Sequence, residues 1–295
     1  MRFLIAGASG FLGSHLSESL VGAGHHVTAL VRRAPGTGEA RWDPSSADLD
    51  PSLLESADVV VNLAGSPTLG NPHSRRWAEQ LVTSRVTTTR VLADAIARSS
   101  RPPALLAGNG ISFYGDHGDE PLTETADTRG DAFLTGVTIA WQAAAQPAVD
   151  AGGRVCILRT APVMDRRSPP LRQQLLQFRA GLGGRLGSGR QYMPMVSLRD
   201  WVAAVTFIAG RDDLSGPVNV CCPQPPTNAE FTRQLARLVH RPAFLTAPAA
   251  LLRPAAGRMA PELLGSMRAV PQVLQAAGFE FSDRTVAEVL ASATA

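Results

Sequence analysis

The strongest constraint on the fold lies at the start of the chain, where a short apolar run meets a glycine-rich turn. Residues 3–6 are apolar, and glycine then recurs at every third position of the segment 7–13, which reads GASGFLG. Leu16 and Leu20 follow with the spacing of one face of a helix. A strand, a glycine turn and a helix in this order predict the first βα unit of a parallel sheet.

Alternating strand and helix patterns continue to about residue 160. The run at 57–63 is continuous and rich in valine, as in a strand that is buried on both faces. Such alternation predicts the α/β class, with a doubly wound parallel sheet in a first domain over residues 1–160. The other predicted elements are strands at 26–31, 104–108 and 155–160 and helices at 77–97 and 134–149.

Residues 161–295 have a different texture. Clustered prolines and a glycine-rich stretch at 181–189 predict loops and short elements. Short helices are predicted at 201–208 and 228–238, and a mainly helical segment at about 242–295. We expect this part of the chain to form a smaller C-terminal substrate lobe that packs with the first domain as one unit.

Composition argues against several classes of protein. The chain has 44% hydrophobic and 18% charged residues, an ordinary globular usage that argues against disorder and coiled coil. It has no apolar run of membrane-spanning length, and its start lacks the pattern of a signal peptide, so we expect a cytoplasmic location. The basic residues are scattered. We therefore expect a monomer or homodimer acting on a small molecule, with neither nucleic acid nor membrane as a partner.

Two residue types limit the chemistry. The three cysteines, Cys156, Cys221 and Cys222, are odd in number and lack metal-ligand spacing, so neither a disulfide framework nor a metal site is predicted. All 28 residues of the Lys+Arg count are arginine, because the chain has no lysine. Schiff-base chemistry, a P-loop lysine and a lysine general base are therefore excluded.

The glycine turn has the spacing of a dinucleotide site, because glycine lets bare backbone approach a pyrophosphate. An ordinary strand-to-helix turn is the alternative. Arg32 and Arg33 follow the second predicted strand, where an acidic residue would favour NAD and arginine favours the 2′-phosphate of NADP. We expect NADP(H) as the cofactor, with two surface arginines as the alternative. The candidate cofactor-binding residues in the turn are Gly7, Ser9, Gly10, Phe11, Leu12 and Gly13.

Further motifs recur in a distinctive order along the chain. They are Asn62-Leu63-Ala64-Gly65, Arg75-Arg76-Trp77, Ser84-Arg85, Phe113-Tyr114-Gly115-Asp116, and Gly187-Ser188-Gly189-Arg190-Gln191. With the glycine turn, they resemble the extended short-chain dehydrogenase/reductase superfamily, and more narrowly its atypical branch of nucleoside-diphosphate-sugar-epimerase-like proteins. Residues 241–242, 264–268 and 277–281 are similar to a C-terminal helical domain of unknown function found in that branch.

The resemblance implies a Rossmann fold with NAD(P) across the strand ends and a substrate pocket roofed by the C-terminal lobe. It also implies that Asn62, Leu63, Ala64 and Gly65 line the cofactor near its adenine ribose. A plain strand-to-loop turn is the alternative for that segment, because Asn and Gly are common at turns.

The chain departs from the superfamily in its catalytic residues. Active members use a tyrosine, a lysine four residues later, and a serine or threonine. Counting back from Trp141 along the predicted helix aligns Leu134 with the tyrosine and Thr138 with the lysine, and Gly110 falls at the serine position. All three standard functional groups are therefore expected to be missing.

Substitutes for the missing groups are few. Tyr114 follows a predicted strand end beside Ser112, so these two are the candidate catalytic residues, with a structural tyrosine hydroxyl as the alternative. Arg85 and Arg190 are candidates to clamp an anionic group of the substrate or a phosphate of the cofactor, and Tyr192 is a candidate to line the substrate lobe. Surface ion pairs and rim packing are the alternatives for these three.

Three functions fit these observations. The first is an NADP(H)-dependent oxidoreductase or epimerase that acts on a small polar molecule. The second is a non-redox tailoring enzyme, such as a cyclase, isomerase or lyase, on the same fold. The third is a non-catalytic NADP-binding regulatory protein. Fold alone does not decide among them.

Overall fold

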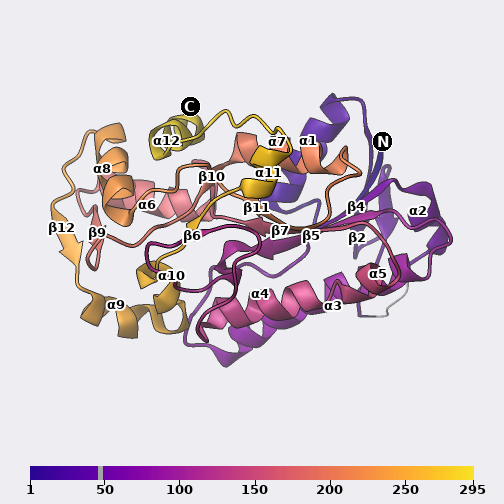
Figure 1. Cartoon of the computed structure of the whole chain (residues 1–295), viewed down its shortest axis with the longest axis horizontal. Helices are drawn as coiled ribbons and strands as arrows, with labels where there is room; N and C mark the ends of the chain where they lie inside the picture. The colour runs from indigo at the N-terminus through magenta and orange to yellow at the C-terminus, as the bar shows by residue number, and fades with distance from the viewer. Residues whose placement is uncertain (46–48) are drawn as a thin grey trace.

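The computed structural model describes residues 1–45 and 49–295, and its centre is a seven-stranded sheet (Figure 1). The strand order is β3-β2-β1-β4-β5-β7-β11, and all neighbouring strands are parallel. This order reverses direction between β1 and β4, as in doubly wound sheets. The strands are β1 (Arg2–Ala6), β2 (His26–Val31), β3 (Glu39–Arg41), β4 (Val59–Asn62), β5 (Ala104–Gly110), β7 (Val155–Thr160) and β11 (Gly216–Val220).

Helices cover both faces of the sheet (Figure 1). Alternate side chains of β1 show why: Phe3 and Ile5 belong to one apolar core, whereas Leu4 and Ala6 belong to another. The first core includes residues of α1 (Phe11–Gly22), α7 (Leu198–Ala209) and α11 (Gln272–Ala276). The second includes residues of α2 (Pro51–Ser56), α3 (Arg75–Ala97) and α5 (Gln146–Asp150), with α4 (Phe133–Ala143) packed beside α3.

The second lobe has its own apolar core. Leu171 and Phe178 of α6 meet Phe231 and Leu235 of α8 there, together with Leu290 of α12. The short parallel strand pairs β8 with β10 and β9 with β12 lie within the lobe, and the pair of β6 with β13 joins it to the first domain. The remaining elements are η1 (Ile111–Phe113), β6 (Pro121–Leu122), β8 (Val163–Met164), α6 (Pro169–Arg179), β9 (Gly184–Leu186), β10 (Val196–Ser197), α8 (Asn228–Leu238), β12 (Leu245–Ala247), α9 (Ala249–Ala256), η2 (Gly257–Met259), α10 (Ala260–Leu264), β13 (Arg268–Ala269) and α12 (Val286–Thr294).

The predicted α/β fold is confirmed, but the sheet crosses the expected boundary at residue 160. The strand β11 pairs with β7, and α7 buries Trp201 in the core that also contains Leu16 of α1. Two helix predictions also need correction. The segment expected to hold loops and short elements contains the 11-residue helix α6, whose first positions are prolines, because the helix start does not need their missing N–H groups. The expected helix at 134–149 is two helices, α4 and α5.

No helix in the described parts of the chain, residues 1–45 and 49–295, is both long enough and apolar enough to span a membrane.

Candidate functional site

The glycine turn lies where the sheet order reverses, between the ends of β1 and β4. Gly7 has φ +83°, a conformation that favours glycine, and a Cβ there would lie 2.7 Å from the Leu63 carbonyl carbon. A Cβ on Gly13 would overlap the Gly7 carbonyl oxygen. The protein's own packing therefore requires glycine at both positions.

Gly10 differs from the other two glycines of the turn. It is exposed, its φ of −75° is open to any residue, and a Cβ there would meet only the Gly7 carbonyl oxygen, at 3.2 Å. It precedes α1 without a side-chain cap, so the first amides of the helix are available to an anion. Ser9 is exposed beside it, and Phe11 and Leu12 are partly buried against the core. The turn therefore fits the phosphates of a dinucleotide.

The loop after β4 is positioned by Asn62, whose side chain is fully buried. Its Nδ2 donates to Thr89 Oγ1 of α3 at 2.8 Å, and its Oδ1 accepts from the Ala64 amide at 3.1 Å. The Asn62 side chain thus holds the loop against α3 instead of facing outward. Leu63 and Ala64 are partly buried beside the glycine turn and Gly65 is exposed, so a ligand could meet this segment mainly through backbone.

The two arginines after β2 have different surroundings. Arg33 forms two hydrogen bonds with the Glu39 carboxylate of β3, at 2.5 and 2.7 Å. Arg32 is exposed and makes no ion pair with any residue in the described ranges 1–45 and 49–295. The structure thus engages Arg33 internally and leaves Arg32 as the available cation at the end of β2.

Arg85 of α3 lies directly against the loop after β4. A Cβ on Gly65 would be 3.3 Å from its guanidinium carbon, and that carbon is 5.1 Å from the centre of the Trp141 ring. Burial lowers the pKa of Arg85 to about 10, so it stays charged near neutral pH. Its guanidinium donates to the Leu81 carbonyl and to Thr68 Oγ1, and no carboxylate in the described segments pairs with it. Arg85 is therefore a suitable anion-binding residue.

The helix α4, with which the superfamily's tyrosine and lysine align, lies beside the end of β5. A Cβ on Gly110 would be 3.2 Å from the Thr138 methyl carbon, so the aligned serine and lysine positions are spatial neighbours. The Thr138 hydroxyl is buried and donates to the carbonyls of Leu134 and Thr135, within its own helix. The three aligned positions, with Leu134 at the third, offer no side-chain acid or base.

Tyr114 is fully buried, so the structure does not place its hydroxyl where a substrate could reach it. The hydroxyl donates to Asn219 Oδ1 at 2.7 Å and accepts from Arg159 Nη1 at 2.9 Å. Burial raises the pKa of Tyr114, and Arg159 partly opposes this. The Arg159 guanidinium also stacks 3.6 Å from the centre of the Phe113 ring. This geometry favours the structural alternative for Tyr114.

Ser112 contacts a carboxylate that the sequence reading did not single out. Its Oγ donates to Glu262 Oε2 of α10 at 2.6 Å, which joins η1 to the C-terminal segment. Glu262 is partly buried, and burial raises the pKa of its carboxyl. One sequence signal could have drawn attention to it: Glu262 is the only acidic residue between Glu230 and Glu280.

Comparisons with known proteins agree with this geometry. The model of the NAD dependent epimerase/dehydratase family matches residues 3–221, and a domain of unknown function, DUF1731, matches residues 247–293. The chain belongs to the NAD dependent epimerase/dehydratase family. The predicted resemblance is thereby confirmed.

Relatives extend along the whole chain. An epimerase family protein of Mycobacterium bovis is 42% identical over 98% of this chain and 96% of its own. The human epimerase family protein SDR39U1, solved with NADPH, is 31% identical, covers 98% of both chains and has a TM-score of 0.88. MoeE5, solved with UDP-glucose and NAD, is 25% identical over 99% of this chain and 97% of its own, with a TM-score of 0.75.

In this member of the epimerase family, the remaining candidates lie on the second lobe. Tyr192 is partly exposed, and its backbone bonds the C-terminal segment through the Ser266 hydroxyl and the Met267 amide. Arg268 stacks over its ring at 5.2 Å. Arg190 is exposed two residues earlier in the chain, and no described contact brings it to the glycine turn or to Ser112.

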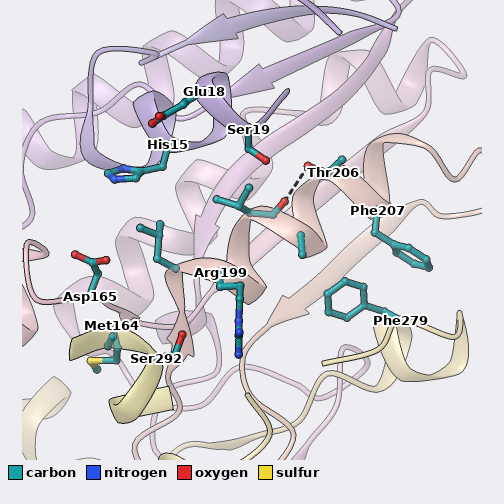
Figure 2. A pocket seen from close by; sticks show the side chains of 14 residues that line it. His15, Glu18, Ser19, Met164, Asp165, Arg199, Thr206, Phe207, Phe279 and Ser292 are labelled. Carbon is teal, nitrogen blue, oxygen red and sulfur yellow. Dashed lines mark hydrogen bonds between the residues drawn. The ribbon is translucent and has the colours of Figure 1, made fainter. Parts of the chain in front are cut away.

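A cavity of about 870 Å³ lies elsewhere, between α1, α7 and the C-terminal segment (Figure 2). Its polar lining is mostly engaged within the protein. His15 bonds the Phe11 carbonyl, Asp165 pairs with Arg167, and Arg199 pairs with Asp283. Since the glycine turn, Arg85 and Ser112 are not among its lining residues, we place the candidate site at the carboxyl edge of the sheet instead.

Proposed function

We propose that the chain is an NADP(H)-dependent oxidoreductase or epimerase of a small polar molecule. The observation that carries the proposal is Gly10, an exposed glycine that the protein's own packing hardly requires, at the uncapped start of α1. A pyrophosphate at this turn accounts for it. The relative solved with NADPH supports the same cofactor type.

In this proposal each element has a defined task. The turn at residues 7–13 binds the pyrophosphate, and Arg32 binds the 2′-phosphate that distinguishes NADP from NAD. Bound NADP(H) supplies hydride exchange at its nicotinamide. Arg85 binds an anionic group, of the substrate or the cofactor, near Gly65. The η2–α10 segment covers the edge of the sheet through the Ser112–Glu262 bond and its contacts with α4.

Binding and turnover test the proposal together. NADPH titrated into the purified protein should show a blue-shifted or quenched nicotinamide fluorescence, with weaker binding of NADH. A panel of small aldehydes, ketones and sugar nucleotides should then contain compounds that are converted, with NADPH consumption followed at its absorbance band or epimers separated by chromatography. No NADPH binding would contradict the cofactor assignment, and binding without any conversion would contradict the reaction.

A non-redox tailoring reaction is the second candidate, because the aligned positions Gly110, Leu134 and Thr138 carry no acid or base. In that case NADPH would bind without being consumed while a substrate still cyclised, eliminated or isomerised. Product analysis of the same panel by mass spectrometry and NMR distinguishes this outcome from a non-catalytic NADP-binding protein, for which the panel would be recovered unchanged.

A further inference from the structure

The bond between Ser112 and Glu262 brings together two residues that are 150 positions apart in the chain. Ser112 is almost fully buried in η1, immediately after β5, and Glu262 is in α10 of the C-terminal segment. The Oγ–Oε2 distance of 2.6 Å is typical of a hydroxyl bound to a carboxylate. The second carboxylate oxygen of Glu262 has no hydrogen-bond partner among the described residues.

The pair lies next to the place where the superfamily's acid and base are missing. The Ser112 carbonyl accepts a hydrogen bond of 2.8 Å from Thr135 Oγ1, and Thr135 stands directly after Leu134 in α4. Gly110, at the aligned serine position, is two residues before Ser112 and touches Thr138. A serine hydroxyl and a carboxyl group therefore adjoin the positions that lost their functional groups.

The pair is not needed to hold α10 in place, because other bonds already do so. Gln191 Nε2 donates to the Leu263 carbonyl at 3.1 Å. Ser266, which follows the helix, donates from its amide to Asp116 and from its hydroxyl to the Gly118 carbonyl. Placing a carboxyl group in a partly buried position has an electrostatic cost, and anchoring does not explain why the chain bears it.

We propose that Ser112 and Glu262 form a proton relay that replaces the missing tyrosine and lysine. In this relay Ser112 is the catalytic residue that touches the reacting oxygen of the substrate, and Glu262 is a positioning residue that acts through it. The proposal rests on the proposed NADP(H)-dependent function and names the proton source that this function requires.

Reduction of a carbonyl through this relay balances in protons and electrons. The carbon receives a hydride, with its electron pair, from the reduced nicotinamide, and the oxygen receives the Ser112 hydroxyl proton. For this step the Ser112 hydroxyl proton, which points to Glu262 Oε2 in the structure, turns to the substrate oxygen, and a protonated Glu262 donates to Ser112 Oγ instead. Ser112 takes that proton as it gives up its own, so the serine is unchanged and Glu262 becomes ionised. Water then returns a proton to Glu262. Oxidation of an alcohol runs through the same bonds in reverse.

The surroundings of Glu262 suit this role. Burial raises the pKa of Glu262, and the Ser112 hydrogen bond opposes the rise. No charged neighbour is among the causes of the shift. The titratable and charged groups on the elements around α10 are Arg253 of α9, Arg258 of η2, His73, Asp116, His117 and Arg268. The relay should therefore respond to pH as an isolated, partly desolvated acid.

The test compares four variants with the wild type on the best compound of the carbonyl panel. Ser112→Ala and Glu262→Gln should each lower kcat by about 10²–10⁴-fold, the usual worth of a positioned acid or base. Ser112→Thr keeps the hydroxyl and should keep most of the activity. Asp116→Ala removes the Oδ1 that accepts from the Ser266 amide and so weakens the anchoring of the same segment without touching the pair; it should keep the activity as well.

A pH profile separates a proton relay from a structural contact. The wild-type reduction rate should be constant at low pH and fall as pH rises through the pKa of Glu262, because the acid must be protonated. Glu262→Gln should lose that limb. Burial raises the pKa of Glu124 as well as that of Glu262, so titration of the glutamate carboxyl carbons by NMR should show two glutamates with a raised pKa. The signal of Glu262 should be absent in Glu262→Gln and that of Glu124 should remain, a readout that needs no turnover. NADPH affinity should be unchanged in all four variants.

The failures of the two proposals are distinguishable. If the wild type converts the panel compound and Glu262→Gln keeps both its rate and its alkaline limb, the relay is wrong and the proposed function stands. If Asp116→Ala loses as much activity as Glu262→Gln, anchoring explains the effect and the relay is also wrong. If NADPH binds but no compound is converted at any pH, the proposed function fails and the relay fails with it.

Discussion

The ends of β1 and β5 lie on the same edge of one sheet but differ in the groups that they offer to a ligand. At the end of β1, packing requires glycine at Gly7 and Gly13 and leaves Gly10 exposed, as the proposed dinucleotide turn needs. At the end of β5, Gly110 and the facing Thr138 occupy the positions aligned with the superfamily's serine and lysine and offer no acid or base. In the proposed function, the end of β1 holds the cofactor and the end of β5 moves protons with a different pair of residues.

The difference follows from what each region needs physically. A pyrophosphate is held largely by backbone N–H groups, and these point at the ligand only if the turn has one particular shape. No residue with a larger side chain can therefore take the place of Gly10. A proton can be delivered by any group of suitable pKa within reach. In the proposed relay such a group comes from α10 in the C-terminal segment, whereas the aligned helix α4 carries no acid or base.

The largest effect that tests this comparison is expected at the turn after β1. Gly10→Val should abolish NADPH binding, with affinity at least about 100-fold lower, because a branched side chain occupies the space into which the pyrophosphate approaches. The protein should still fold, since φ −75° and ψ 169° at Gly10 suit valine and a Cβ meets one atom at 3.2 Å. Calorimetric titration with NADPH and thermal unfolding measure the two properties.

Gly13→Val is the matched control for that experiment. Its Cβ would overlap the Gly7 carbonyl oxygen, so this variant should fail to fold or unfold at a much lower temperature. Unchanged NADPH affinity in folded Gly10→Val would mean that the turn does not hold a dinucleotide, and the contrast between the two ends of the sheet would be lost.

An intermediate effect is expected for Arg32, the cation that we propose selects NADP over NAD. Arg32→Ala should weaken NADPH binding by roughly 10- to 100-fold and leave NADH binding nearly unchanged, because a charge-assisted phosphate contact is worth about 1.5–3 kcal/mol. Arg33→Ala is the matched control and should have a smaller effect, since Glu39 already binds the Arg33 guanidinium. Equal losses for NADPH and NADH in Arg32→Ala would contradict the assignment of the 2′-phosphate site.

Much of the fold could be predicted because local pattern and tertiary structure agree. The apolar runs at β1, β2 and β4 and the glycine spacing at residues 7–13 each describe a short segment, and each was found where expected. The strand β11 was not predicted, because Gly216 and Pro217 weaken its pattern and its place in the sheet depends on pairing with β7.

The candidate site was less predictable from sequence, since it joins distant segments. The role of Asn62 as a support for its own loop depends on Thr89, which lies 27 residues later on α3. Glu262 carries no motif, and only the packing of α10 over η1 brings it to Ser112. Sequence pattern indicates the backbone of a site well and indicates poorly which side chains converge on it.

The smallest effect on turnover is expected for Tyr114, although its polar neighbours Asn219 and Arg159 resemble catalytic partners. Tyr114→Phe should change kcat little, because the hydroxyl is fully buried and bonded to Asn219 and Arg159. It should instead lower the free energy of unfolding by about 1–3 kcal/mol, since the buried guanidinium of Arg159 loses a partner. Urea unfolding of Tyr114→Phe, set beside its steady-state kinetics, measures both. A kcat lowered 100-fold or more in a variant of unchanged stability would return proton transfer to Tyr114, and the end of β5 would then have kept a tyrosine acid after all.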